Sequence, residues 1–212
     1  MGSLRIAAAY DEAFCFYYRE NFRELERSGL EIVFFSPMES GSLPRDISGL
    51  YLGGGYPELH VKELSGARDA MVDIKQKIDD GLPVIAECGG FMYLNKAIFA
   101  DDGDVQDEMC GVFDASCRNA HRLVRFGYVT VTEEDGKWLP GGAMIRGHEF
   151  HHYESTDNGD GCIVTKASDG STYREIHVTD TLWAGWPHLY FASAPCFAKG
   201  FADKCRQYRN RM

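Results

Sequence analysis

The feature that most constrains this chain is the stretch Pro83–Leu94, which reads PVIAECGGFMYL. An apolar run typical of a buried strand ends at Cys88, passes through Gly89-Gly90 and continues as apolar residues with helical spacing. This predicts a strand-to-helix corner that raises the cysteine above the sheet edge and favours its thiolate. The corner indicates a nucleophile, although a single buried cysteine also fits an inert packing role.

The first half of the chain alternates strand and helix patterns around this corner. We expect strands at 4–9, 31–35, 49–52 and 84–86, and helices at about 18–28 and 61–80. Such alternation predicts an α/β fold of flavodoxin-like, doubly wound type, with a mainly parallel sheet. Because ligands collect at the carboxyl ends of parallel strands, the corner at Cys88 and the stretch Gly53–Gly55 should open onto the same edge.

The second half has a different pattern. After a loop at 101–108, residues 123–132, 142–153, 162–167 and 173–178 resemble antiparallel strands that extend the sheet, and 195–211 resembles a terminal helix. No linker or repeat interrupts the sequence. We therefore expect one domain over residues 4–212.

Composition limits the partners and the compartment. With 32 acidic and 22 basic residues, the net charge of −10 disfavours nucleic acid and anionic membranes as partners. No apolar run reaches the roughly 20 residues needed to span a bilayer. The seven cysteines are scattered without C-x-x-C pairs, which fits a reducing cytoplasm. We expect a cytoplasmic protein.

A thiolate nucleophile needs a proton acceptor and a stabiliser for the oxyanion. Among the seven histidines, His188 is the strongest candidate because it ends an apolar stretch that could reach the same sheet edge; a structural core histidine is the alternative. The N–H of Gly89, with that of Gly54 or Gly55, is the natural oxyanion pair. The triple glycine could instead be a plain turn, and it lacks the spacing of a phosphate loop.

The pentad His148–His152 formally matches the zinc motif H-E-x-x-H. That motif needs a helix, so that both histidines share a face. Here the sequence alternates like a strand, which would separate Glu149 and His151 from His148 and His152. We therefore expect a structural or substrate-contacting strand and no metal site.

Four ordered blocks resemble the cobyrinate a,c-diamide synthase family, and in particular its carboxyl-terminal, class I type glutamine amidotransferase domain. The resemblance covers about residues 4–191. It implies that Cys88 takes ammonia from glutamine and that His188 raises its nucleophilicity. The blocks are Asp11-x-Ala13-Phe14-x-Phe16-Tyr17-Tyr18-x-x-Asn21, Leu52-Gly53-Gly54-Gly55-Tyr56-Pro57-Glu58, Glu87-Cys88-Gly89-Gly90-x-Met92-Tyr93-Leu94 and Arg146-Gly147-His148-Glu149-Phe150-His151.

The chain departs from the family pattern twice. Class I glutaminases carry a glutamate two residues after the histidine, where this chain has Tyr190. The pair either works as a dyad, or an acid from elsewhere, such as Glu87 or Glu149, orients the imidazole. In addition, no P-loop motif occurs, so the ATP-binding synthetase domain of the family is absent from this chain. ATP and Mg²⁺ are expected on that domain, in cis or in trans, and no cofactor is expected here.

The resemblance implies glutamine hydrolysis through a Cys88 thioester and transfer of ammonia to the a and c acetate groups of a corrinoid, in cobalamin biosynthesis. The macrocycle could be cobyrinate, hydrogenobyrinate or nickel sirohydrochlorin, bound at the domain interface, and a homodimer is possible. Two alternatives are another cysteine hydrolase on the same fold, such as a peptidase, and a non-catalytic module that binds a tetrapyrrole or docks on a synthetase. Candidate glutamine or macrocycle contacts are Tyr56, Arg125, Tyr128, His148 and His151.

Overall fold

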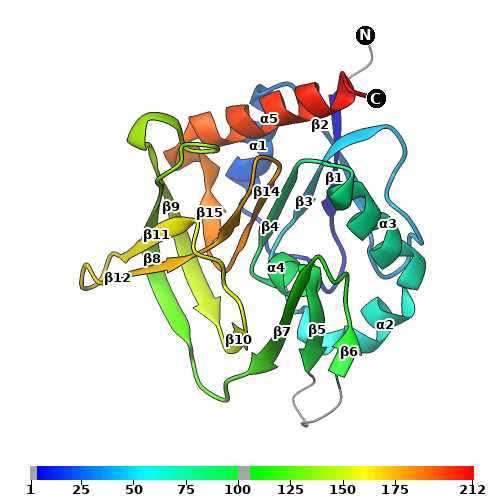
Figure 1. The fold of residues 1–212 in the computed structure, drawn as a ribbon, viewed down its shortest axis with the longest axis horizontal. Coiled ribbons are helices and arrows are strands. Elements are labelled where there is room, and N and C mark those ends of the chain that lie inside the picture. Colours follow the sequence, from blue (N-terminus) through cyan, green and yellow to red (C-terminus); the bar gives the residue numbers. More distant parts are fainter. Residues whose placement is uncertain (1–3, 100–105) are drawn as a thin grey trace.

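The computed structural model describes residues 4–99 and 106–212, which form three β-sheets with helices packed around them (Figure 1). The α-helices are α1 (Arg19–Arg27), α2 (Val61–Gly66), α3 (Arg68–Asp79), α4 (Gly89–Leu94) and α5 (Pro195–Arg209). Short 3₁₀ turns are η1 (Pro57–Leu59), η2 (Pro140–Gly142) and η3 (Phe191–Ser193).

The central sheet has the strand order β13-β14-β4-β3-β1-β2. All neighbours are parallel except β13, which pairs antiparallel with β14. The expected α/β class with a mainly parallel, doubly wound sheet is thereby confirmed. The strands are β1 (Leu4–Ala9), β2 (Leu30–Phe35), β3 (Ile47–Leu52), β4 (Val84–Glu87), β13 (His177–Val178) and β14 (Leu182–Gly185).

Of the strands in the second half, β13 and β14 extend the central sheet, whereas the others form two further sheets. β8 and β9 each expose side chains on one face, which suits an antiparallel sheet with a solvated side better than a covered central sheet. The five-stranded sheet, in the order β12-β11-β8-β9-β15, contains β8 (Arg125–Glu133), β9 (Met144–His151), β11 (Cys162–Lys166), β12 (Thr172–Glu175) and β15 (His188–Tyr190). The four-stranded sheet, in the order β10-β7-β5-β6, contains β5 (Asn95–Phe99), β6 (Gln106–Glu108), β7 (Phe113–Asn119) and β10 (Tyr153–Ser155).

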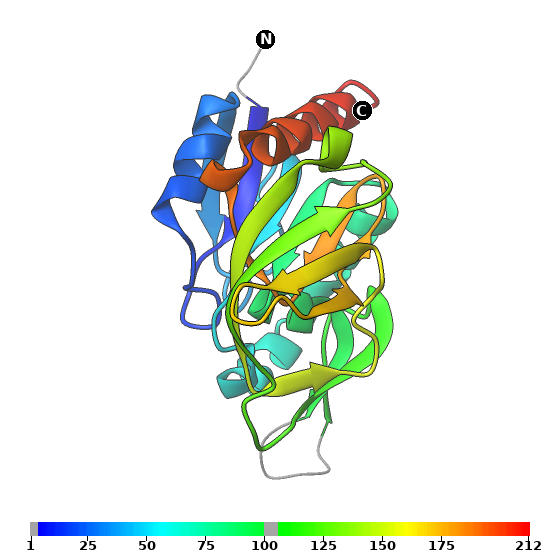
Figure 2. The same cartoon turned by 90° about the vertical axis from the view of Figure 1, so that its left-hand side faces the viewer.

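The pleat of the central strands separates two hydrophobic cores. On β1, Ile6 and Ala8 face one core, and Ala7 and Ala9 face the other. The first core lies against α1, α5 and the five-stranded sheet, which Figure 2 shows in front of the central sheet and below α5. The second core lies against α2, α3 and α4. Alternating side chains thus hold a different layer on each face of one sheet.

Several expected boundaries shift. The helix expected at 61–80 is divided at Ala67, whose ψ of 52° leaves the helical region, into α2 and α3. The terminal helix ends at Arg209. Of the expected loop 101–108, Gln106–Glu108 forms β6, and its first part lies outside the described residues. In the described ranges, no helix is long and apolar enough to cross a membrane.

Candidate active site

Cys88 lies on the tight corner between β4 and α4. Its backbone has φ 46° and ψ −102°, a conformation that a non-glycine residue adopts only at an energetic cost. The corner is held by the N–H of Cys88, which donates to the carbonyl of Gly185 at 2.8 Å, and by its carbonyl, which accepts from the N–H of Met92 at 2.9 Å. The predicted strand-to-helix corner is therefore present, with the thiol at the carboxyl end of β4.

His188 reaches this corner from a different sheet. It is the first residue of β15, which pairs antiparallel with β9 so that His188 lies opposite His148. Because β14 ends at Gly185, the turn between β14 and β15 carries the chain from the central sheet to the five-stranded sheet. His188 is 6% exposed, and the ring of Phe16 lies edge-on to the imidazole, with 4.5 Å between the ring centroids.

The two side chains line one cavity of about 170 Å³. The structure thus brings together Cys88, His188 and two of the proposed substrate contacts, Tyr56 and His148. Phe16 and Phe150 complete the wall, although the sequence did not single them out as site residues. Phe16 and Phe150 both lie inside the sequence blocks that carry the resemblance. Their place in these blocks was the signal that could have identified them as site residues.

The glycines that follow β3, Gly53–Gly55, lie close to those that follow Cys88, Gly89 and Gly90. A Cβ on Gly89 would lie 3.1 Å from the backbone nitrogen of Gly55, so the two N–H groups are neighbours. The N–H of Gly54 already donates to the carbonyl of Phe16 at 3.2 Å. In the described chain no backbone carbonyl accepts from Gly55. Gly55 and Gly89, rather than Gly54, therefore offer the available pair of donors.

Gly54 has a different role, because it makes room for the imidazole. A Cβ at this position would lie 2.1 Å from Cε1 and 2.8 Å from Nδ1 of His188. The position therefore tolerates no side chain while the imidazole keeps its place.

Burial sets the ionisation of the pair. Burial raises the pKa of the Cys88 thiol well above its usual value; the charge of Glu58 adds to this, and the Gly89 N–H opposes it. Burial, with the nearby His148 and His151, lowers the pKa of His188 to about 3. This differs from the expectation that the helix start would favour the thiolate, because desolvation is the larger effect. The resting site holds a neutral thiol and a neutral imidazole, the free-base form that a proton acceptor needs.

Glu87 does not bond to the imidazole. Its Oε1 accepts from the backbone N–H of Leu189 at 3.1 Å, and its Oε2 accepts from the hydroxyl of Tyr51 at 2.9 Å. Burial raises the pKa of Glu87 to about 8, and these two hydrogen bonds act in the opposite direction. In the part of the chain that the structure describes, Nδ1 of His188 has no hydrogen-bond partner.

Glu149 also lies away from the imidazole, on the opposite face of β9 from His148. It accepts from the hydroxyl of Tyr173, and its charge acts on the nearby Glu175. Burial, and then the charge of Glu149, raise the pKa of Glu175 to about 9. Residues His148–His151 of the H-E-x-x-H motif are thus on β9, and His152 follows the strand. The described ranges contain no group of three potential ligands that could hold a metal ion.

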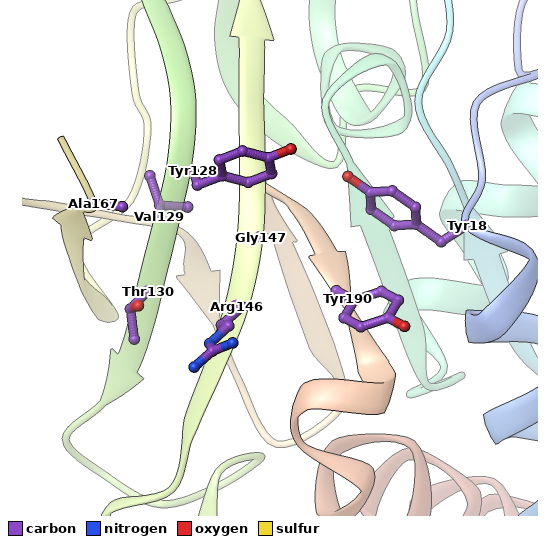
Figure 3. Close-up of a pocket in the computed structure, with 8 residues that line it drawn as sticks. All are labelled: Tyr18, Tyr128, Val129, Thr130, Arg146, Gly147, Ala167 and Tyr190. Carbon is purple, nitrogen blue, oxygen red and sulfur yellow. The ribbon is translucent and has the colours of Figure 1, made fainter.

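The remaining proposed contacts lie outside the Cys88 cavity. Arg125 and His151 line a second pocket with Glu175 and Trp186, and the His151 ring stacks on that of Trp186 at 4.1 Å. Tyr128 lines a third, larger pocket of about 620 Å³ beside the cavity, where its hydroxyl and that of Tyr18 point toward each other (Figure 3). Arg146 and Tyr190 line the same pocket, so the residue in place of the family's glutamate faces outward.

Solved structures share this fold. One is a Thermoplasma acidophilum protein assigned to GMP synthase, which matches all of this chain and 98% of its own, with a TM-score of 0.63 and 20% identity. A glutamine amidotransferase matches with the same TM-score at 15% identity, over 95% of this chain and 98% of its own. The fold is that of solved glutamine amidotransferase structures.

The sequence comparisons are more specific. Residues 5–196 match the model of the CobB/CobQ-like glutamine amidotransferase domain, and the chain belongs to this family. It is 37% identical to cobyrinate a,c-diamide synthase of Thermoplasma volcanium over 100% of this chain and 46% of that protein. The enzyme of the same name from Clostridium tetani is 45% identical over 70% of this chain and 34% of its own length. The chain thus spans about half the length of these relatives or less.

The contact between Gly54 and the imidazole predicts the effect of one added methyl group. Gly54→Ala should displace His188 and slow glutamate release from glutamine by about 100-fold, since small misplacements at a reactive centre have effects of this size. Gly66→Ala is the matched control, because a Cβ there meets nothing within 4 Å. Activity would be measured in the full amidotransferase and folding by thermal unfolding. A Gly54→Ala enzyme with the control's rate would show that the imidazole can work elsewhere.

The raised pKa of Glu175 predicts a pH dependence of stability. Because the folded-state pKa of Glu175 is raised, its contribution is fully present below the unfolded value of 4.5 and is lost as pH rises toward about 9. Glu175→Gln keeps the shape of the side chain but cannot ionise. Relative to wild type, its free energy of unfolding should rise by up to about 1.4 kcal/mol per pH unit in this window. Urea unfolding at pH 6 and 8.5 measures this, and equal pH slopes for the two proteins would contradict it.

Proposed function

We propose that this domain hydrolyses the side-chain amide of glutamine, with Cys88 as nucleophile and His188 as general base and acid. The main support is that a cysteine on a strained strand-to-helix corner and a neutral imidazole line the same small cavity. The N–H groups of Gly55 and Gly89, which lie beside that corner, are suited to receive the oxyanion. Membership of an amidotransferase family supports the same chemistry.

The reaction proceeds in two halves. His188 takes the thiol proton as the sulfur of Cys88 attacks the amide carbon, and the oxyanion of the tetrahedral intermediate accepts from Gly55 and Gly89. The carbon–nitrogen bond then breaks, and the imidazolium returns its proton to the departing nitrogen as ammonia. Water, deprotonated by the same imidazole, attacks the thioester to release glutamate and restore the thiol.

The cavity favours a small substrate over a peptide. Its volume is about 170 Å³, and the rings of Phe16, Tyr56 and Phe150 line it, which suits a small molecule. Tyr56 and His148 line this cavity and remain our candidates for glutamine contacts. The positions of Arg125 and His151 in a separate pocket favour roles away from glutamine.

For the complete enzyme we propose ATP-dependent amidation of the a and c acetate groups of a corrinoid. This rests on the relatives named cobyrinate a,c-diamide synthase, which extend well beyond the part that this chain matches. A synthetase domain, in cis or in trans, would bind ATP, Mg²⁺ and the macrocycle and would receive ammonia from the cavity.

Replacing the nucleophile or the base tests the hydrolysis directly. Cys88→Ser should abolish glutamate release, and His188→Ala should lower its rate at least about 1,000-fold, as for other residues that act as a catalytic unit. Both variants should keep amidation from added ammonium chloride, which bypasses the cavity. Full glutamine-dependent activity in Cys88→Ser would refute the assignment.

The synthetase domain would dock, we propose, on a surface that we call the aromatic rim: Phe16, Tyr56, Phe126, Tyr128 and Phe150. These side chains are exposed, with Tyr128 at 74%, and they surround or adjoin the Cys88 cavity. Aromatic residues with a neighbouring arginine are typical of the centres of protein interfaces, and Arg146 lines the adjacent pocket in Figure 3.

A charge on the aromatic rim should uncouple glutamine hydrolysis from amidation. Tyr128→Glu should lower the ratio of glutamine-dependent to ammonia-dependent amidation about tenfold or more, which corresponds to about 1.4 kcal/mol of lost docking. Val72→Glu is the control, because Val72 is 64% exposed on α3, which lies across the central sheet from β8 (Figure 1). If both variants kept the wild-type ratio, the rim would not be the docking surface.

A further inference from the structure

The main chain around His188 is held by side chains from two distant segments. The strand β15 has one edge paired with β9, so Leu189, which lies opposite Gly147, turns its own N–H and carbonyl away from β9. Glu87, at the end of β4, accepts from the Leu189 N–H at 3.1 Å. The side-chain amide of Asn21, in α1, donates to the Leu189 carbonyl at 2.8 Å.

Asn21 makes a second contact with the same segment. Its Oδ1 accepts from the N–H of Phe191 at 2.9 Å, so one side chain satisfies two main-chain groups on either side of Tyr190. Asn21 is fully buried and Glu87 is 2% exposed. Buried polar groups of this kind are costly to leave unpaired, so their hydrogen bonds define the position of β15 closely.

Tyr51 joins the two side chains into one network. Its hydroxyl donates to Oε2 of Glu87 at 2.9 Å and accepts from the amide of Asn21 at 3.2 Å. The network therefore links β3, β4 and α1 to the strand that carries the imidazole. β4 also leads directly into Cys88. Glu87 is therefore the residue before the nucleophile, and its side chain holds the strand that carries the base.

The imidazole has no comparable anchor of its own. Among the described residues nothing bonds to Nδ1, and the position two residues later is Tyr190, whose ring packs against Tyr18 at 5.7 Å. The ring contacts Gly54 on one edge and Phe16 on another. Its direction toward the cavity must therefore come from packing and from the backbone that bears it.

We propose that Asn21 and Glu87 are positioning residues, which orient His188 through the main chain of β15 in place of a carboxylate bonded to its ring. This rests on the hydrolysis proposed above and adds to it a means of orienting the base. Glu87 acts here as a hydrogen-bond acceptor, and its negative charge is not required. Neither residue lines the Cys88 cavity.

The test separates hydrogen bonding from charge with two variants at each position, in the full amidotransferase. Glu87→Ala and Asn21→Ala should lower kcat for glutamate release about 100-fold and change KM less than about threefold, because the base is displaced while the cavity remains. Glu87→Gln keeps an oxygen for the Leu189 N–H and should stay within about fivefold of wild type. Asn21→Asp keeps the acceptor for Phe191 but loses the donor for Leu189, and should fall between wild type and Asn21→Ala.

A second buried glutamate provides the control for a general loss of stability. Glu133 accepts from the N–H groups of Lys137, Trp138 and Leu139 and does not line the cavity. Glu133→Ala should lower the thermal midpoint but leave kcat for glutamine unchanged. Ammonia-dependent amidation reports folding in every variant.

Each outcome is decisive. A loss in Glu87→Gln as large as that in Glu87→Ala would mean that the charge acts, and the proposal for Glu87 would fail. Losses at both positions no greater than in Glu133→Ala, or losses confined to KM, would overturn the positioning role altogether. If the wild-type enzyme released no glutamate while it used ammonia, the proposed hydrolysis itself would be wrong, which is a separate result.

Discussion

The structure depends on how closely the main chain can approach itself around Cys88. A Cβ on Gly90 would lie 2.3 Å from the carbonyl oxygen of Leu52, and one on Gly55 would lie 2.1 Å from that of Ala13. The first contact brings the corner after β4 against the end of β3, and the second brings the corner after β3 against the segment that follows β1. The φ of 46° at Cys88 is the local strain that accompanies this arrangement.

The site joins two architectures that could not form it separately. The parallel sheet supplies the cysteine and the donors at the carboxyl ends of β3 and β4, whereas the antiparallel sheet supplies His188 on β15. Gly147 on β9 assists, because a Cβ there would lie 2.9 Å from the carbonyl of His188. The network of Asn21, Tyr51 and Glu87 then ties the second architecture to the first.

Local patterns predicted much of this arrangement. The period of the apolar residues located the strands before and after α1, and the change from strand period to helix period at Cys88 located the corner. Local patterns could not predict which pocket Arg125 and His151 line. His151 belongs to the block Arg146–His151 but lies on the opposite face of β9 from His148. Arg125 on β8 pairs with His151, and both residues line another pocket. Asn21 was quoted only as part of a motif, because its contacts lie 168 and 170 residues away.

The sequence by itself determined the α/β class, the cysteine corner and the choice of His188, because each rests on neighbouring residues or on blocks shared with a family. Only the tertiary structure decided that the Gly54 N–H bonds to Phe16 while that of Gly55 has no backbone acceptor among the described residues. It also decided that Glu87 holds the backbone of Leu189 rather than the imidazole, and that burial raises the pKa of the thiol. These depend on distances between segments remote in sequence and on exclusion of water, and neither is encoded in any short stretch of residues.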